Sequence, residues 1–209
     1  MVIRTLPVGQ LEANCYVVAD EETSEAMIVD PGDEPERILE LCEGLDVLYI
    51  VLTHAHFDHA GGVAELKEAT GAEVVVHEAE LEVYASIRDQ ASMWGFNVPS
   101  LPEPDLTVSE GDGINIGNNT LTVIHTPGHT PGSMCLYAEE GIVFTGDTLF
   151  AGSIGRTDFP GGSMKDMRAS FRKLMGLPDD TAVFSGHGTP TTIGTEKEQN
   201  MFATEFLSQ

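Results

Sequence analysis

One run of the sequence has the pattern of a strand that is buried on both faces. It is VLYIVLTH, residues 47–54, which is nearly continuous in apolar side chains and has the length of a single strand. Half-exposed strands instead alternate apolar and polar residues. Helix-like spacing of apolar residues at 34–45 and 61–72 flanks the run and supplies elements that can cover it. The chain is therefore predicted to have an α/β fold.

The second half of the chain alternates short strand-like runs with turn signals. The runs are LTV, INI, LTVIHT, MCLYAE and GIVFTGD, between residues 106 and 147. Their spacing predicts an antiparallel meander, followed by a helix at 162–178, a strand at 181–188 and a terminal helix at 196–207. Segment 80–100 begins helix-like and then loses its period, so we expect a mobile lid there. No linker interrupts the sequence, and we expect residues 1–209 to form one domain.

The charge of the chain argues against polyanionic partners. Lys and Arg number 10 against 34 Asp and Glu, which gives a net charge of −24. Such a surface repels nucleic acid and anionic membranes, although it can also be a general adaptation that keeps a protein soluble in a salt-rich cytoplasm. We find neither a leader pattern nor 18 consecutive apolar residues. We expect a cytoplasmic protein whose three cysteines are reduced and mostly buried.

Histidines and aspartates gather where the predicted strands end. A lone histidine in a loop is usually a surface residue, but five of the seven histidines stand at such exits together with two aspartates. Rigid strands hold the bases of these loops with the precision that metal coordination needs. Imidazole and carboxylate without thiolate suit zinc, iron or manganese. The candidate ligands are His54, His56, Asp58, His59, His129, Asp147 and His187. His77 and His125 are not expected to be ligands, although either could orient one.

The spacing of these residues predicts two neighbouring metal sites. The first would use His54, His56 and His129, the second Asp58, His59 and His187, and Asp147 would bridge them. Two divalent cations lower the pKa of bound water to roughly 7, which makes hydroxide available at neutral pH. The expected reaction is hydrolysis of an activated carbonyl by a metal-bound hydroxide. Zinc is the expected metal, with iron or manganese as alternatives.

The motifs that carry these residues resemble those of a known family. THAHFDH, GHTPGS, TGD and SGHG match, in order and over nearly the whole chain, the metal-binding motifs of the metallo-β-lactamase superfamily. The resemblance implies a four-layer αββα sandwich with the metals at one edge of its two sheets. It assigns metal binding to the same seven residues. It also implies that Asp58 is catalytic, because the matching residue orients or deprotonates the nucleophilic water.

Two further stretches narrow the resemblance. LFAGSIGRTDFPGG (149–162) and GTPTTIGTEKEQNMF (188–202) are similar to the small glyoxalase II-like hydrolases, which cleave thioesters of the hydroxyacylglutathione type. A small-molecule thioester is therefore the expected substrate. Only 22 residues follow His187, so we expect no separate C-terminal helical domain of the kind that holds glutathione in full-length glyoxalase II. Arg156 could bind a substrate carboxylate or form an ion pair with Asp158.

Other functions compete with this interpretation. GRTDF also resembles the persulfide dioxygenases of the superfamily, which hold one iron through the residues matching His54, His129 and Asp147. A β-lactamase is disfavoured by the missing export signal and by the lack of a cysteine near Asp147, and a nuclease by the acidic charge. A non-catalytic metal protein would need saturated coordination, whereas seven ligands leave two metals with open positions. The sequence favours no particular oligomeric state.

Overall fold

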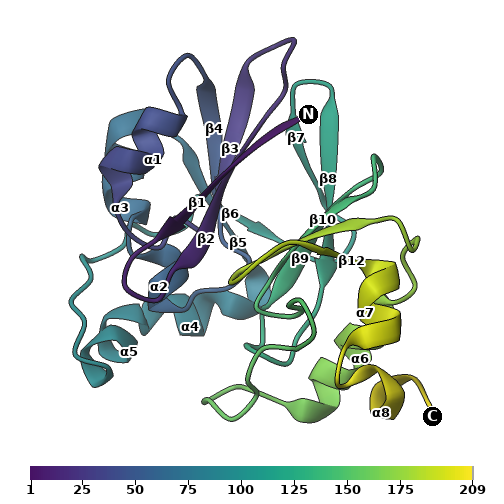
Figure 1. Ribbon diagram of the computed structural model, residues 1–209. Coiled ribbons are helices and arrows are strands. Elements are labelled where there is room, and N and C mark those ends of the chain that lie inside the picture. Colours follow the sequence, from purple (N-terminus) through teal and green to yellow (C-terminus); the bar gives the residue numbers. More distant parts are fainter. Residues whose placement is uncertain (209) are drawn as a thin grey trace.

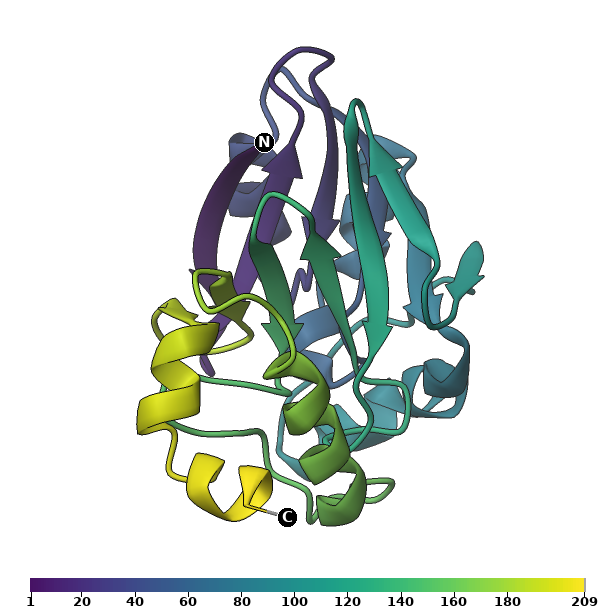
Figure 2. The ribbon, with the colours of Figure 1, turned by 90° about the vertical axis from the view of Figure 1, so that its right-hand side faces the viewer.

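The computed structural model describes residues 1–208 as two six-stranded sheets packed face to face (Figures 1 and 2). The strands of the first sheet lie side by side in chain order. Its first two pairings are antiparallel and the other three are parallel. The strands are β1 (Val2–Val8), β2 (Ala13–Ala19), β3 (Glu25–Val29), β4 (Asp46–Val51), β5 (Glu73–His77) and β6 (Leu106–Val108).

The prediction that LTV begins the antiparallel meander was wrong, because this run is β6 and pairs in parallel with β5 of the first sheet. The rest of the predicted meander lies in the second sheet. It runs from β7 to β10, and β11 then pairs in parallel with β10. Helix α6 joins these two parallel strands, and β12 closes the far edge of the sheet. The strands are β7 (Gly113–Ile116), β8 (Asn119–His125), β9 (Met134–Ala138), β10 (Ile142–Gly146), β11 (Ala182–Ser185) and β12 (Thr191–Thr192).

Helices cover the outer face of each sheet (Figure 1). Those that come before β6 are α1 (Pro35–Leu41), α2 (Phe57–Ala60), α3 (Val63–Thr70), the short 3₁₀ helix η1 (Glu78–Glu80), α4 (Leu81–Ala85) and α5 (Ile87–Met93). Those on the second sheet are α6 (Met164–Leu174), α7 (Ile193–Gln199) and α8 (Ala203–Leu207).

Three buried apolar clusters separate the four layers. One lies between the first sheet and its helices and includes Ile38 and Leu66. A second lies between the sheets, where Met27 of the first meets Phe144 of the second. The third packs Phe171, with other residues of α6 to α8, against the outer face of the second sheet. Helix, sheet, sheet and helix therefore follow one another, which confirms the predicted αββα sandwich.

The apolar run at 47–54 behaves as its pattern predicts. Strand β4 lies in the interior of its sheet, between β3 and β5. Successive side chains of a strand point to opposite faces. Accordingly, Ile50 packs into the cluster under the helices and Val51 into the cluster between the sheets. Both faces are buried, so a polar residue at either position would leave an unpaired group in the core.

The prediction of one continuous terminal helix at 196–207 was wrong, because this segment is divided between α7 and α8. Asn200 adopts an extended conformation between them. Its side-chain amide donates to the Ser153 carbonyl and to Glu196, and its oxygen accepts from the Phe202 amide. Asparagine side chains compete in this way with helical backbone hydrogen bonds. None of the helices within residues 1–208 has the length and apolarity to cross a membrane.

Candidate metal centre

The seven candidate ligands come together at one edge of the two sheets. Four of them follow β4, on the loop that leads into α2 and on that helix itself. His129 follows β8, Asp147 follows β10 and His187 follows β11. The backbone of the two sheets also meets at this edge, since the Asn14 amide donates to the Gly186 carbonyl over 2.7 Å. The ends of both sheets therefore form one platform under the candidate site.

The first predicted group is assembled in the structure. His54, His56 and His129 each offer a ligand atom, and these atoms lie within 4.8 Å of one another. Nε2 of His129 is 2.8 Å from Nδ1 of His56. His54 and His129 are buried, and His56 is partly buried. The nitrogen atoms face one another across a gap that a single cation would fill.

The second predicted group lies beside the first. Nε2 of the buried His59 is 3.3 Å from Nε2 of His187 and 3.8 Å from Oδ2 of Asp58. The same carboxylate oxygen of Asp58 is 3.4 Å from Nε2 of His187. The ligand atoms of these three residues also lie within 4.8 Å of one another. A second cation would have two imidazoles and one carboxylate here.

Asp147 lies between the two groups. Its Oδ1 is 3.4 Å from Nε2 of His59, in the second group, and its Oδ2 is 3.5 Å from Nε2 of His129, in the first. Oδ2 is also 3.8 Å from Nε2 of His187, so the carboxylate of Asp147 contacts histidines of both groups. The close approach depends on Gly186, where a Cβ atom would lie 2.2 Å from Oδ1 of Asp147. The carboxylate of Asp147 therefore has the position that a ligand bridging two cations needs.

Hydrogen bonds fix which nitrogen of His59 and of His54 carries a proton. Asp30 accepts from the Thr53 hydroxyl over 2.6 Å and from Nδ1 of His59 over 3.1 Å. Because the hydroxyl proton goes to Asp30, Oγ1 of Thr53 is left to accept from Nδ1 of His54, 3.2 Å away. Both rings are therefore protonated at Nδ1, and Nε2 of each ring is the atom that faces the site and is available to a cation.

His129 is oriented in the same way by a main-chain group. Its Nδ1 is 2.8 Å from the carbonyl oxygen of Arg156, which can only accept. The ring nitrogen at Nδ1 is therefore the donor, and Nε2 is free as a ligand. Arg156 thus contributes to the site through its backbone carbonyl, which orients the His129 ring.

The residues present fit a pair of divalent cations. Nε2 of His54 and Oδ1 of Asp147 are buried and have no hydrogen-bond partner within the described residues. Buried polar atoms are nearly always paired, so two orphaned lone-pair atoms facing one site indicate a missing electrophile. The mixture of imidazole nitrogens and carboxylate oxygens suits zinc, iron or manganese.

The pKa values of the histidines in the metal-free site are strongly shifted, because the rings and carboxylates are buried close together. Burial, together with the neighbouring histidines, holds the pKa of His54 well below its usual range and lowers that of His56 to about 3. Although burial opposes it, the carboxylates of Asp147, Asp58 and Asp30 raise the pKa of His59 to about 10. His54 and His56 are therefore neutral, whereas His59 takes a proton in the place that a cation would occupy.

Two positioning residues were missed at the sequence level. Asp30 reads as part of an Asp-Pro-Gly turn, yet it is buried and holds Thr53 and His59. Glu80 is also buried, and one of its oxygens accepts from the Ala55 amide, between two ligands. Its other oxygen accepts from the Thr130 hydroxyl and the Gly132 amide, beside His129. Glu80 thereby connects the two loops that carry the first group.

Three residues lie outside the cluster. Arg156 forms a bidentate ion pair with Asp158 and stacks over the Phe159 ring at 3.7 Å, with half of its side chain exposed. The ion pair is one of the two alternatives that the sequence left open. His77 and His125 stack on each other at 4.0 Å and contribute to neither metal-binding group, as expected.

Comparison with known proteins agrees with the geometry. The chain is 40% identical to the probable metallo-hydrolase YqgX of Bacillus subtilis and 38% identical to the hydroxyacylglutathione hydrolase GloC of Haemophilus influenzae. Each alignment covers 97% of this chain and 98% of the relative.

Solved structures share the fold over nearly the full chain. The B3 metallo-β-lactamase BLEG-1 superposes with a TM-score of 0.90 at 37% identity, covering 97% of this chain and all of its own. TTHA1623, solved in a di-iron-bound form, gives 0.88 at 42% identity and covers 95% and 99% of the two chains. ETHE1 from Myxococcus xanthus gives 0.79 at 32% identity and covers 98% and 85%.

A family model matches the same region of the sequence. It spans residues 8–187, from the end of β1 to the last of the candidate ligands, and describes the metallo-beta-lactamase superfamily. With the two facing sheets and the histidine and aspartate groups at their edge, this match shows that the chain belongs to the metallo-β-lactamase superfamily.

Proposed function

We propose that the protein is a dinuclear metallo-hydrolase that cleaves small-molecule thioesters of the hydroxyacylglutathione type. His54, His56 and His129 would hold one divalent cation and Asp58, His59 and His187 a second, with Asp147 between them. The observation that carries the proposal is that both groups are complete and face the two oxygens of Asp147. Similarity to a hydroxyacylglutathione hydrolase supports the substrate class.

The cations would supply Lewis acidity and lower the pKa of water to roughly 7. Asp58 would accept a proton from the nucleophilic water, since its carboxylate lies within the second group, 3.4 Å from Nε2 of His187, and its side chain is 17% exposed. Asp30, Thr53 and Glu80 hold the histidines and their loops in place. Hydrolysis then forms a carbon–oxygen bond from water and breaks the carbon–sulfur bond, and the leaving thiolate takes up a proton.

Zinc is the proposed metal, and iron or manganese would suit the same ligands. We further propose that the chain acts as one domain in the cytoplasm on a small molecule, without nucleic acid or membrane partners. Its three cysteines are buried and free, as expected of a reduced compartment, and its charge of −24 disfavours polyanions. Exposed Arg156 remains a candidate contact for a substrate carboxylate.

One alternative is supported by a specific comparison. The similarity to ETHE1 and the GRTDF stretch favour a mononuclear iron dioxygenase that acts on a persulfide through His54, His129 and Asp147. That reaction leaves the complete second group of Asp58, His59 and His187 without a role. For this reason we favour the hydrolase.

The test is an assay on protein of defined metal content. Stripped protein is reloaded with zinc, manganese or ferrous iron, and bound metal is measured together with thiol release from a panel of hydroxyacyl thioesters. Two metals per chain and thiol release are expected. One iron per chain with oxygen uptake on glutathione persulfide would establish the dioxygenase instead, and cleavage of a β-lactam without any thioester would also refute the proposal.

A further inference from the structure

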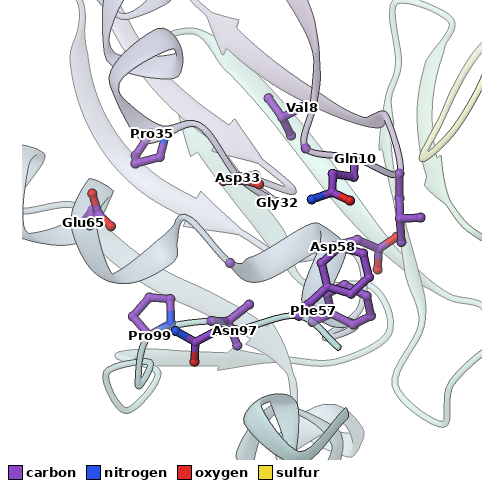
Figure 3. Close-up of a pocket in the computed structure, with 15 residues that line it drawn as sticks. Val8, Gln10, Gly32, Asp33, Pro35, Phe57, Asp58, Glu65, Asn97 and Pro99 are labelled. Atoms are coloured by element: carbon purple, nitrogen blue, oxygen red, sulfur yellow. The ribbon is translucent and has the colours of Figure 1, made fainter. Parts of the chain in front are cut away.

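A cavity of about 200 Å³ borders the second metal-binding group (Figure 3). Its walls come from the turn between β1 and β2, from α2 and from the segment at 96–99 that follows α5. Asp58 and the adjacent Phe57 lie at one end of the cavity, and Glu65 lies at the other (Figure 3). A substrate whose carbonyl reaches the metal centre can therefore extend one of its limbs along this cavity.

The charged side chains that line the cavity are all acidic. Its charged lining residues are Asp33, Asp58 and Glu65, and no lysine, arginine or histidine is among them. Asp58 is committed to His59 and His187, but neither Asp33 nor Glu65 forms an ion pair within residues 1–208. A carboxylate on the substrate limb would find no partner there, whereas a cation would find two.

The uncharged part of the lining suits a compact organic group. Phe57 and Phe96 pack with ring centroids 4.9 Å apart and form an apolar wall. Gln10 and Asn97 also line the cavity, and across the described part of the chain neither side-chain amide is hydrogen-bonded. Gln10 points toward the middle of the pocket (Figure 3). Ligand pockets typically combine such apolar walls with a few available polar groups.

We propose that this cavity receives one limb of the thioester substrate and selects neutral or cationic limbs against limbs that carry a carboxylate. The inference rests on the proposed function, because it assumes that the scissile carbonyl sits at the metal centre. Glutathione carries two carboxylates, so a glutathione limb would lie outside this cavity, on the other side of the centre. The limb with the stated charge preference would then be the acyl group.

The experiment uses two substrate series on the zinc-loaded protein. In one, the acyl group is constant and the thiol limb ends in a trimethylammonium, tert-butyl or carboxylate group on chains of equal length. In the other, the thiol is constant and the acyl limb carries the same three ends. For the limb in the cavity, kcat/KM should be about tenfold higher for the ammonium than for the carboxylate, with the tert-butyl compound between them.

Matched variants assign the preference to the cavity. Asp33→Asn with Glu65→Gln should reduce the tenfold ratio to about two. Glu40→Gln with Glu68→Gln changes the net charge equally at exposed positions on α1 and α3 outside the cavity, and should leave the ratio unchanged. Equal rates for all three ends in both series, or equal effects of the two double variants, would overturn the inference.

Binding separates this inference from the proposed function. Thioether analogues that cannot be hydrolysed carry the same three ends, and their affinities are measured by calorimetry. Tighter binding of the ammonium thioether that depends on Glu65, in a protein that cleaves no thioester, would retain the cavity preference and refute the hydrolase. Cleavage of thioesters without any charge preference, in rate or in binding, would support the hydrolase and refute the cavity preference.

Discussion

The carboxylate of Asp30 and the imidazole of His59 form a fully buried hydrogen bond, 3.1 Å long, from Nδ1 of the ring to Oδ2 of the acid. Asp30 also accepts from both the amide and the hydroxyl of Thr53. One carboxylate outside the two metal-binding groups therefore sets the tautomer of His59 directly and that of His54 through Thr53. Hydrogen bonds of this kind tune the affinity of a metal site.

Asp30→Asn should weaken metal binding without unfolding the protein. Asparagine tolerates the left-handed conformation that Asp30 adopts, with φ of 52°. Its oxygen would keep the bond from the Thr53 amide, which leaves its NH₂ group facing Nδ1 of His59. The ring must then carry its proton on Nε2, toward the metal. We expect the affinity of the second site to fall about 10- to 100-fold, as measured by competition with a chelator.

Asp46→Asn is the control for that substitution, because Asp46 is exposed at the start of β4. It should bind two metals with the affinity of the wild type. Unchanged metal affinity in Asp30→Asn would show that the buried hydrogen bond does not orient His59.

Asp58→Asn should separate metal binding from catalysis. The amide oxygen can still serve as a ligand, but the side chain can no longer take up a proton. We expect kcat to fall by about 10²- to 10⁴-fold, the usual contribution of a general base, while metal content stays close to that of the wild type. Steady-state kinetics and elemental analysis of the same samples test this. Full activity in the variant would exclude Asp58 as the proton acceptor.

Glu80→Gln should loosen the first metal site. Both oxygens of Glu80 accept hydrogen bonds, from Ala55 on one side and from Thr130 and Gly132 on the other. An amide group necessarily turns its NH₂ toward one of these donors, which costs about 1–3 kcal/mol of unfolding free energy. Urea unfolding measures the loss, and spectra of cobalt bound at the first site report the altered geometry. Glu78→Gln, on the same 3₁₀ helix but exposed, should change neither.

His77 should make the stability of the protein depend on pH. Burial, and then the neighbouring His125, lowers the pKa of His77 from 6.5 to about 4. Between these values the unfolded chain binds more protons than the folded one, so stability falls as the pH is lowered from 6.5 to 4. The loss is about 3 kcal/mol when complete.

His77→Asn removes this titration but keeps a side-chain acceptor for the Ala79 amide, which His77 caps. The wild type should therefore lose more stability than the variant on acidification, as measured by urea unfolding of the metal-free proteins at pH 7 and pH 4.5. Parallel losses in the two proteins would contradict the assignment.

Most strands of the two sheets and the clustering of the candidate ligands could be predicted from the sequence, because both leave local signals. The buried run at 47–54 ends directly at the THAHFDH motif, so the strand and the site are encoded together. His129, Asp147 and His187 each follow an apolar run of strand length. The loops after β4, β8, β10 and β11 all leave the same edge of the sheets. The position of each candidate ligand directly after a strand therefore indicated that these side chains lie near one another.

The positioning residues could not be predicted, because their partners are set by tertiary pairing. Asp30 meets Thr53 only because β3 and β4 pair in parallel, with Val29 opposite Val51. Neither residue type nor spacing reveals that register. Glu80 likewise follows β5 in a sequence that reads as an ordinary helix start, and its partners lie 25 to 52 residues away. Tertiary contacts of this kind leave no local pattern.

The most direct test of the account is a crystal structure of the zinc-loaded protein with anomalous data collected at the zinc edge. We predict two peaks about 3.5–4 Å apart, the spacing of dinuclear sites, with Asp147 between them. One peak should be coordinated by His54, His56 and His129, and the other by Asp58, His59 and His187. A fully loaded crystal in which no metal lies within bonding distance of these residues, or in which only one of the two groups binds, would contradict the dinuclear centre.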